Sequence, residues 1–224
     1  MMSQAANFYF TAVSKDPFNT DGLAGLQRAG QWVLNDHLAR FDEARLAGNR
    51  AVAVAAFEKA KTYQTKVERL GIGLLILGDT EAAYNRVKND HLEDVYEEAL
   101  AHLEAEKFSE ALKTFDEVFR LEADYRDSRS LADIAFCEPL YRNGLNALEN
   151  SHWRSAYADF NACVSRDDNF KDAKMLRDEC LEKGQYGIAL VNFENGSNRT
   201  GMENKLKSYV EQALSKSKDP FLHL

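Results

Sequence analysis

FSEALKTFDEVFRL (residues 108–121) and WRSAYADFNACVSR (residues 153–166) are two copies of one pattern, set 45 residues apart in the chain. The correspondence runs without a gap through residues 96–128 and 141–173. Nine positions match in residue class: Tyr96, Ala99, Leu103, Phe108, Ala111, Phe115, Val118, Tyr125 and Asp127 correspond to Tyr141, Gly144, Leu148, Trp153, Ala156, Phe160, Cys163, Phe170 and Asp172. An ungapped match of this length indicates an internal repeat.

Each copy contains two segments with the 3.6-residue periodicity of an amphipathic helix. Apolar or small residues recur at i, i+3 and i+7 in the first segment and at i, i+4 and i+7 in the second, with a short polar turn between them at 105–107 and 149–151. Small residues at 99/144 and 111/156 let two antiparallel helices approach closely. The repeat therefore predicts a helical hairpin whose apolar faces are covered by neighbouring hairpins.

This hairpin pattern resembles the tetratricopeptide repeat. The resemblance rests on Ala111-x3-Phe115-x2-Val118 and Ala156-x3-Phe160-x2-Cys163. It extends to two earlier segments, in which Ala53, Phe57 and Ala60, and Ala5, Tyr9, Ala12 and Pro17, have matching spacing. It implies an all-α solenoid of helical hairpins over residues 3–183.

The chain departs from the period of about 34 residues usual in that family, because its second-helix aromatics are 48, 58 and 45 residues apart. Long first helices at 20–47, 80–105 and 127–150 would account for the difference. The predicted repeat domain, residues 1–183, has units at 3–17, 20–63, 80–121 and 127–165 and a final helix at 170–183. Residues 65–77 are predicted to form an extra helix.

The composition narrows the classes of function. A net charge of −8 argues against nucleic-acid binding, which normally requires a basic face. The longest apolar run, Leu70–Gly78, is shorter than the roughly 20 residues needed to cross a bilayer, so we interpret it as a buried helix and expect no membrane insertion. Cys137, Cys163 and Cys180 have no disulfide or zinc spacing, and we expect them to be buried.

Sequence motifs for catalysis or cofactor binding are missing. Gly71-Ile72-Gly73 lacks the third glycine of a dinucleotide fingerprint. The five histidines are isolated, and no His-x3-His or Cys-x2-Cys pair offers metal ligands. Carboxylates on helices are read as solvated faces rather than acid–base groups. We therefore assign no catalytic residue, no cofactor and no metal, and expect a protein that is not an enzyme.

A solenoid of hairpins has a concave surface, lined by first helices, that suits an extended peptide or a helix. Some members of the resembled family hold a peptide carboxylate with basic and asparagine side chains, but this chain has Tyr, Leu and Glu at the matching places. We therefore expect a mixed apolar and acidic groove, although core packing is an open alternative for its tyrosines and leucines. The candidate groove residues are Tyr96, Leu100, Leu103, Glu104, Tyr141, Leu145, Leu148 and Glu149.

Residues 186–224 differ from the rest of the chain. After Gly184, the run at 187–193 is rich in strand-forming residues, Thr200-x2-Glu203 reads as a capping box, and apolar residues at helical spacing follow up to residue 214. With Phe221–Leu224 at the end, the order strand, helix, strand predicts the start of an α/β layer. These 39 residues resemble the first part of a curli-assembly lipoprotein (CsgG-type) domain, which implies a bacterial envelope context.

The combined prediction is a tetratricopeptide-like scaffold for protein–protein interaction in a bacterial cell-envelope assembly, with a protein or peptide partner and no nucleic acid. Two alternatives remain open. One is a self-assembling structural subunit, hence a homo-oligomer, and the other is a regulatory or adaptor domain of a larger multidomain protein. The tail resemblance favours the periplasm or cell envelope, with the cytoplasm as the alternative.

Overall fold

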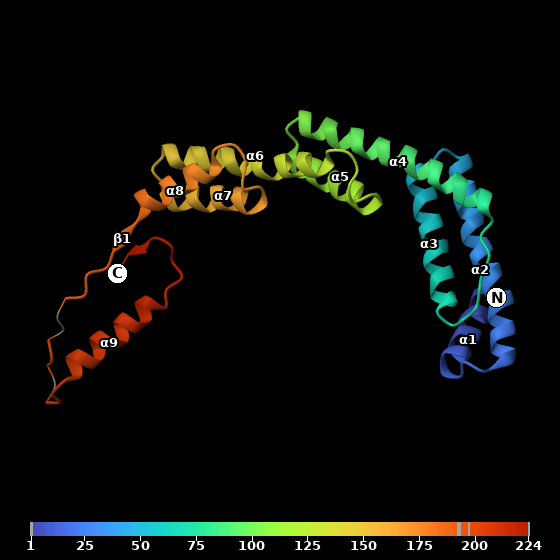
Figure 1. Ribbon diagram of the computed structural model, residues 1–224, viewed down its shortest axis with the longest axis horizontal. Coiled ribbons are helices and arrows are strands. Elements are labelled where there is room, and N and C mark those ends of the chain that lie inside the picture. The colour runs from blue at the N-terminus through green and yellow to red at the C-terminus, as the bar shows by residue number, and fades with distance from the viewer. Residues whose placement is uncertain (1, 192–193, 197, 224) are drawn as a thin grey trace. The chain divides into compact units, whose positions relative to one another are not determined.

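The computed structural model describes residues 2–191, 194–196 and 198–223 (Figure 1). Helix accounts for 75% of the structure and strand for almost none, which confirms the predicted all-α class. Within the described residues the elements are α1 (Met2–Lys15), α2 (Thr20–Leu46), α3 (Arg50–Glu68), α4 (Gly78–Glu104), α5 (Phe108–Leu121), α6 (Ser128–Glu149), α7 (Trp153–Arg166), α8 (Ala173–Gly184), β1 (Tyr186–Gly187), α9 (Met202–Ser215) and β2 (Leu222–His223).

The predicted long first helices are present. The expected ranges 20–47, 80–105 and 127–150 correspond to α2, α4 and α6, each within two residues at either end. Pro139 lies inside α6, which continues through it. The period is thus longer than in the resembled repeat because the first helix of each pair is long.

The chain forms two compact units, which we describe separately. The first consists of Met1–Ala101 with Thr114–Tyr125, and the second of His102–Lys113 with Arg126–Leu224. The predicted boundary between residues 183 and 186 is not tested by this division and stays a prediction.

In the first unit, α1, α2 and α3 lie side by side (Figure 1). Asparagines cap the two longer helices: the Asn19 side chain accepts a hydrogen bond from the Gly22 N–H at 2.7 Å, and Asn49 accepts one from the Val52 N–H at 3.2 Å. Close approach of α1 and α2 depends on Gly25, because a Cβ there would lie 2.5 Å from the Tyr9 ring. The core beneath these helices includes Val13, Leu26, Leu34, Phe41, Phe57, Ala60 and Val67.

The segment between α3 and α4 corrects one prediction. Neither the extra helix at 65–77 nor the buried helix at Leu70–Gly78 exists, since α3 runs to Glu68 and residues 72–77 form neither helix nor strand. Gly71, at φ +81°, ends the helix in the left-handed conformation, and three glycines in nine residues disfavour its continuation. The apolar run alternates in burial instead. We call residues 71–77 the strap.

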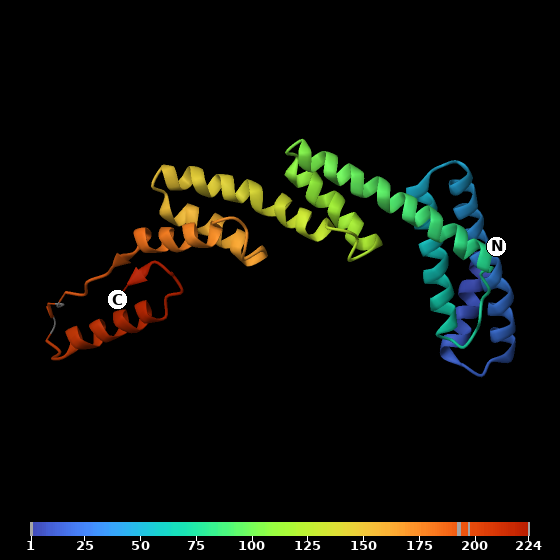
Figure 2. The same cartoon turned by 45° about the horizontal axis from the view of Figure 1, so that its top comes forward.

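In the second unit, α6, α7 and α8 pack around one apolar cluster (yellow to orange in Figure 2). Gly144 of α6 lets the Phe160 ring approach the helix backbone, because a Cβ there would lie 2.7 Å from the ring. The three cysteines are free and buried, as predicted. The cluster consists of Cys137, Ala156, Phe160, Cys163, Phe170, Ala173, Leu176 and Cys180.

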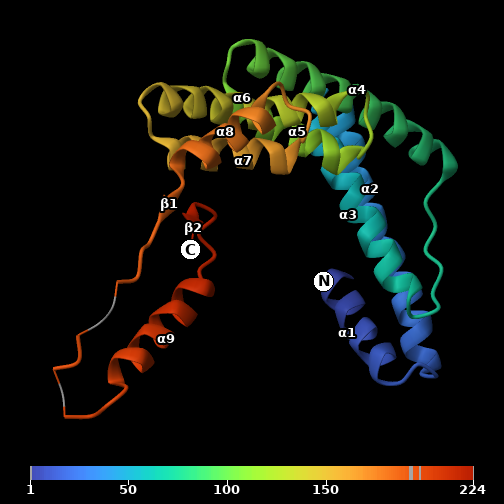
Figure 3. The same ribbon diagram turned by 60° about the vertical axis from the view of Figure 1, so that its left-hand side comes forward.

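The C-terminal segment is attached to α7 and α8 through its two ends (Figure 3). β1 and β2 pair in parallel, Tyr186 beside Leu222, and the Tyr186 N–H donates to the Phe221 carbonyl at 3.0 Å. Phe221 is buried, with its ring 5.0 Å from that of Tyr157, and the Arg154 guanidinium contacts Asp219 at 3.1 Å.

Two details of the tail prediction differ from the structure. Of the strand expected at 187–193, only Gly187 lies in β1, residues 188–191 are irregular, and Asn192 and Phe193 lie outside the described residues. The expected capping box does not form, because Gly201 is the N-cap of α9 without a side-chain hydrogen bond. Glu203 instead accepts from the Asn195 side chain at 2.7 Å.

Candidate binding site between α3 and α4

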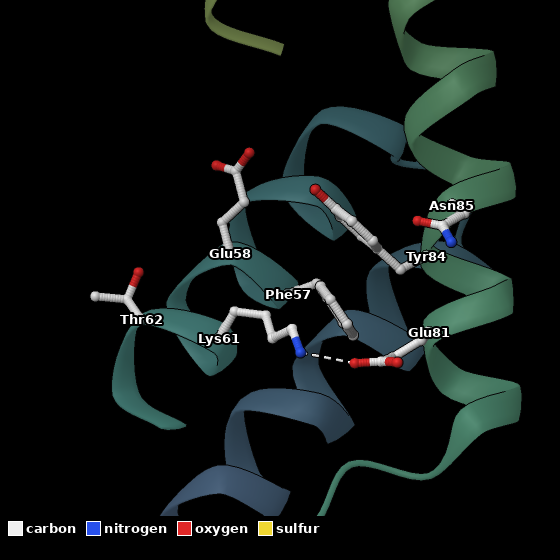
Figure 4. A pocket seen from close by; sticks show the side chains of 7 residues that line it. All are labelled: Phe57, Glu58, Lys61, Thr62, Glu81, Tyr84 and Asn85. Atoms are coloured by element: carbon white, nitrogen blue, oxygen red, sulfur yellow. Dashed lines mark hydrogen bonds and ion pairs between the residues drawn. The ribbon is translucent and has the colours of Figure 1, made fainter. Parts of the chain in front are cut away.

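An open pocket of about 570 Å³ lies between α3 and α4 in the first unit (Figure 4). Four lining residues come from α3 and three from α4. They are Phe57, Glu58, Lys61, Thr62, Glu81, Tyr84 and Asn85.

Two stacked aromatic rings form the apolar part of the pocket. The rings of Phe57 and Tyr84 are nearly parallel, with centroids 4.0 Å apart and an angle of 14° between planes. Phe41 of α2 meets both edge-on, at 5.4 and 6.4 Å. Phe57 is only 2% exposed, so the ring pair is anchored in the core while Tyr84 is half-buried. This anchoring fixes the orientation of the Tyr84 ring at the pocket.

Burial raises the pKa of Tyr84, the nearby Glu58 carboxylate adds to the increase, and Arg120 opposes it. The Tyr84 hydroxyl is therefore protonated at neutral pH. It is able to donate and to accept a hydrogen bond.

Charged side chains of both signs flank the rings. Lys61 Nζ contacts Glu81 Oε1 at 2.7 Å, as the dashed line in Figure 4 shows. On the other side, Arg120 of α5 donates from Nη1 to Glu58 Oε2 at 3.0 Å. All four side chains are about 40–50% exposed, and exposed pairs of this kind contribute at most about 1 kcal/mol each. They can exchange partners at little cost in stability.

Of the predicted groove residues, Tyr96 and Leu100 lie in the first unit. Tyr96 is only 6% exposed, and its ring meets Phe115 at 6.5 Å and Tyr125 at 5.5 Å, both edge-on. Leu100 is half-buried. For Tyr96 the structure supports the alternative reading, in which the tyrosine is part of the core.

The other six predicted residues lie in the second unit. Leu145 and Leu148 pack partly buried against the α6–α8 cluster, Leu103 is half-buried, and Glu104 and Glu149 are exposed. None of the eight predicted residues lines the pocket between α3 and α4.

Tyr141 has a polar partner. Its hydroxyl hydrogen-bonds Asp172 Oδ1 at 2.5 Å, and this bond raises the pKa of Tyr141 to about 12. Its ring packs edge-on against Phe160 and Phe170. The hydroxyl is thus committed to a contact within the hairpin.

The pocket has no signature in the sequence. Phe57 matches the spacing of the second-helix aromatics, but Lys61, Glu81 and Tyr84 carry no recognisable spacing. They meet because the strap returns the chain so that the start of α4 lies beside α3.

Among the residues that the structure describes, no group of three or more His, Cys, Asp and Glu side chains is placed to hold a metal ion. In the same part of the chain, no helix has the length and apolar character needed to cross a membrane. Comparison with protein-family models, curated proteins and solved structures found no match to this chain.

Proposed function

We propose that the chain is a non-enzymatic scaffold that binds a protein partner, and that the pocket between α3 and α4 is its contact site. The observation that carries this proposal is the Phe57–Tyr84 stack, presented in an open pocket between two exposed ion pairs. Protein interfaces concentrate binding energy in anchored aromatic residues surrounded by polar groups.

The chemistry of the pocket indicates which partner fits. An apolar or aromatic side chain can lie against the ring pair, where the rings are already immobilised and lose little entropy on binding. A neighbouring charged residue of the partner can exchange into the Lys61–Glu81 or the Glu58–Arg120 pair. We therefore propose a partner segment with one apolar anchor and a charged neighbour.

A crosslinking experiment tests this proposal. A photoreactive residue is placed in the full chain at Thr62, on the pocket wall, or at Lys59, which is exposed on α3 outside the pocket. We expect one discrete crosslinked protein from position 62 and not from 59, and loss of it on Glu81→Lys but not on the matched change Glu68→Lys. Equal crosslinking from both positions would contradict the pocket assignment.

We further propose the solenoid arrangement and the envelope context, which rest on the tetratricopeptide and CsgG-type resemblances. For the tail, the supporting observation is that two parallel strands joined through a helix, β1–α9–β2, make a βαβ unit, the element from which α/β layers are built. Cell fractionation tests the envelope context: the protein is expressed in a bacterium, and we expect it in the envelope fraction.

Self-assembly is the second candidate function. It is favoured by α9, which has no buried residue and exposes Met202, Leu206 and Tyr209 along one face. Light scattering over a dilution series distinguishes the two, because a monomer at high concentration excludes self-assembly.

A further inference from the structure

The strap packs against α2 and α3, and none of its residues lines the pocket between α3 and α4. Its side chains alternate in burial: Ile72 and Leu74 are 6% and 3% exposed, whereas Leu75 and Leu77 are 75% and 70% exposed. This period of two is that of an extended chain lying on an apolar surface. In Figure 3 the strap runs beside α2 and α3 from the end of α3 to the start of α4.

The buried strap side chains enter the groove between α2 and α3. Ile72 and Leu74 belong to one cluster with Leu34 of α2 and Ala60 of α3. Leu74 packs close to the backbone of α2 at Gly30, where an added Cβ would lie 3.6 Å from both Leu74 methyl groups, at van der Waals contact. The groove thus has separate places for aliphatic side chains at alternate positions of an extended chain.

Two glutamines hold the backbone of the strap, one from each helix. Gln31 of α2 donates from Nε2 to the Leu75 carbonyl and accepts from the Leu75 N–H, both at 2.9 Å. Gln64 of α3 donates to the Leu74 carbonyl at 2.8 Å. Successive residues of an extended chain direct their backbone groups to opposite edges, so the two glutamines hold opposite edges. The Gln31 amide also donates to Asn35 Oδ1 at 2.9 Å, which helps to orient it.

Backbone hydrogen bonds combined with places for alternate side chains are the means by which proteins recognise extended peptides. We propose that the groove between α2 and α3 is a binding site for an extended peptide with aliphatic residues at alternate positions, and that the strap is its built-in competitor. A partner segment of this chemistry enters the groove by displacing the strap. Gly71 and Gly73 of the strap and Gly78 at the start of α4 give the backbone the conformational freedom that this displacement needs, and Gly71 already adopts a left-handed φ of +81°.

The strap is tethered beside the groove, at an effective concentration of the order of millimolar or above. A free peptide therefore binds the wild-type chain weakly. Changes that weaken the packing of the strap in the groove should expose the site. The test uses the full chain with Ile72→Ser and Leu74→Ser, which removes the two buried side chains but leaves Gln31 and Gln64 in place. The probe is a fluorescent peptide of sequence LGIGLLILG flanked by lysines, and binding is followed by anisotropy.

We expect the double variant to bind the probe at least about tenfold more tightly than the wild type. Adding Gln31→Ala and Gln64→Ala should weaken binding of the probe at least about tenfold relative to the double variant. The control is a peptide with aspartate at the positions of Ile72 and Leu74, which should not bind. A variant with native-like helical circular dichroism that fails to bind the probe would overturn the proposal, as would equal binding of the control peptide.

If the double variant loses its helical signal, the milder variant Leu74→Ala replaces it. We expect this variant to bind the probe at least about threefold more tightly than the wild type, and the same results would overturn the proposal. The site shares no residue with the pocket between α3 and α4. Failure of this experiment and failure of the crosslinking experiment are therefore distinguishable.

Discussion

The aromatic core of the first repeat copy lies in the first unit and that of the second copy in the second unit, and the two cores have the same construction. In each, one tyrosine ring meets two aromatic rings edge-on, at 6.5 and 5.5 Å in the first copy and 5.8 and 5.9 Å in the second. The backbone repeats as well, since non-glycine residues adopt positive φ at equivalent turns: Glu106 and Ser151 at 55° and 59°, Arg126 and Lys171 both at 47°. The sequence repeat therefore corresponds to a repeat of side-chain packing.

One polar group beside these cores differs between the copies, the hydroxyl of Tyr125. In the first copy the Tyr125 hydroxyl donates to Glu93 Oε2 at 2.6 Å. The second copy has Phe170 at the position of Tyr125, and the equivalent of Glu93, Glu138, forms ion pairs with Arg142 and Lys171. The comparison teaches that both copies keep aromatic rings at the buried positions, while a hydroxyl that forms a hydrogen bond in the first copy, that of Tyr125, is missing from the second.

The largest expected effect is common to both copies. Phe115→Ala and Phe160→Ala each remove a fully buried ring and should each lower the free energy of unfolding by about 3–5 kcal/mol, measured by urea denaturation. Phe18→Ala, at a side chain that is 90% exposed, is the matched control and should change stability by less than about 0.5 kcal/mol. Losses no larger than the control's would show that the repeat does not define the core.

The next effect should separate the copies. Gly144→Ala places a Cβ 2.7 Å from the Phe160 ring and should destabilise by about 1–3 kcal/mol, although alanine has the higher helix propensity. The first copy already has alanine at the equivalent position, Ala99. Phe160→Leu should relieve the clash, so the two changes combined should cost less than their sum. Simple additivity in a double-mutant cycle would argue against a steric cause.

A smaller change makes the first copy resemble the second. Tyr125→Phe removes the hydrogen bond to the half-buried Glu93 carboxylate and should cost about 1–2 kcal/mol in urea denaturation. The reverse change, Phe170→Tyr, should stabilise by less than Tyr125→Phe costs, because the Glu138 carboxylate already binds Arg142 and Lys171. An equal and opposite effect of the two changes would mean that the two positions are interchangeable.

The smallest effect concerns alkaline pH. The pKa of Tyr141 is raised to about 12 by its hydrogen bond to Asp172, against a usual value of about 10 in an unfolded chain. In that window the unfolded chain loses the proton first, so the stability from this bond is complete below pH 10 and declines as pH rises towards 12. Melting temperatures between pH 9 and 11.5 should fall less steeply for Tyr141→Phe than for the wild type. Identical slopes would contradict the assignment.

The local part of the fold was predictable from the sequence. The ranges of α2, α4 and α6 followed from the wide spacing of the second-helix aromatics, which left room for long first helices. The role of Tyr96 could not be decided in this way, since a tyrosine at this spacing can face either a concave surface or the core. The strap was missed because a run of aliphatic residues fits a buried helix and an extended segment equally well, and only its glycines favoured the latter.

The pocket was beyond sequence reasoning for a related reason. Lys61 and Glu81 are 20 residues apart and belong to different helices, so their contact depends on the path of the strap between them. The path of the strap, which is not part of a repeat, thus determines where the candidate site lies, while helices supply its walls.

Ile76 of the strap gives the first unit a means of communication. Its side chain packs against both the cluster that holds Ile72 and Leu74 and the cluster that contains Phe41, Phe57 and Tyr84. Release of the strap would therefore withdraw a side chain from the support of the aromatic stack. By thermodynamic linkage, a ligand that disfavours strap release at one site must weaken binding of a displacing peptide at the other by the same factor. Ile76 thus links the two proposed surfaces, and a pocket ligand that stabilises the aromatic stack would oppose binding of a displacing peptide.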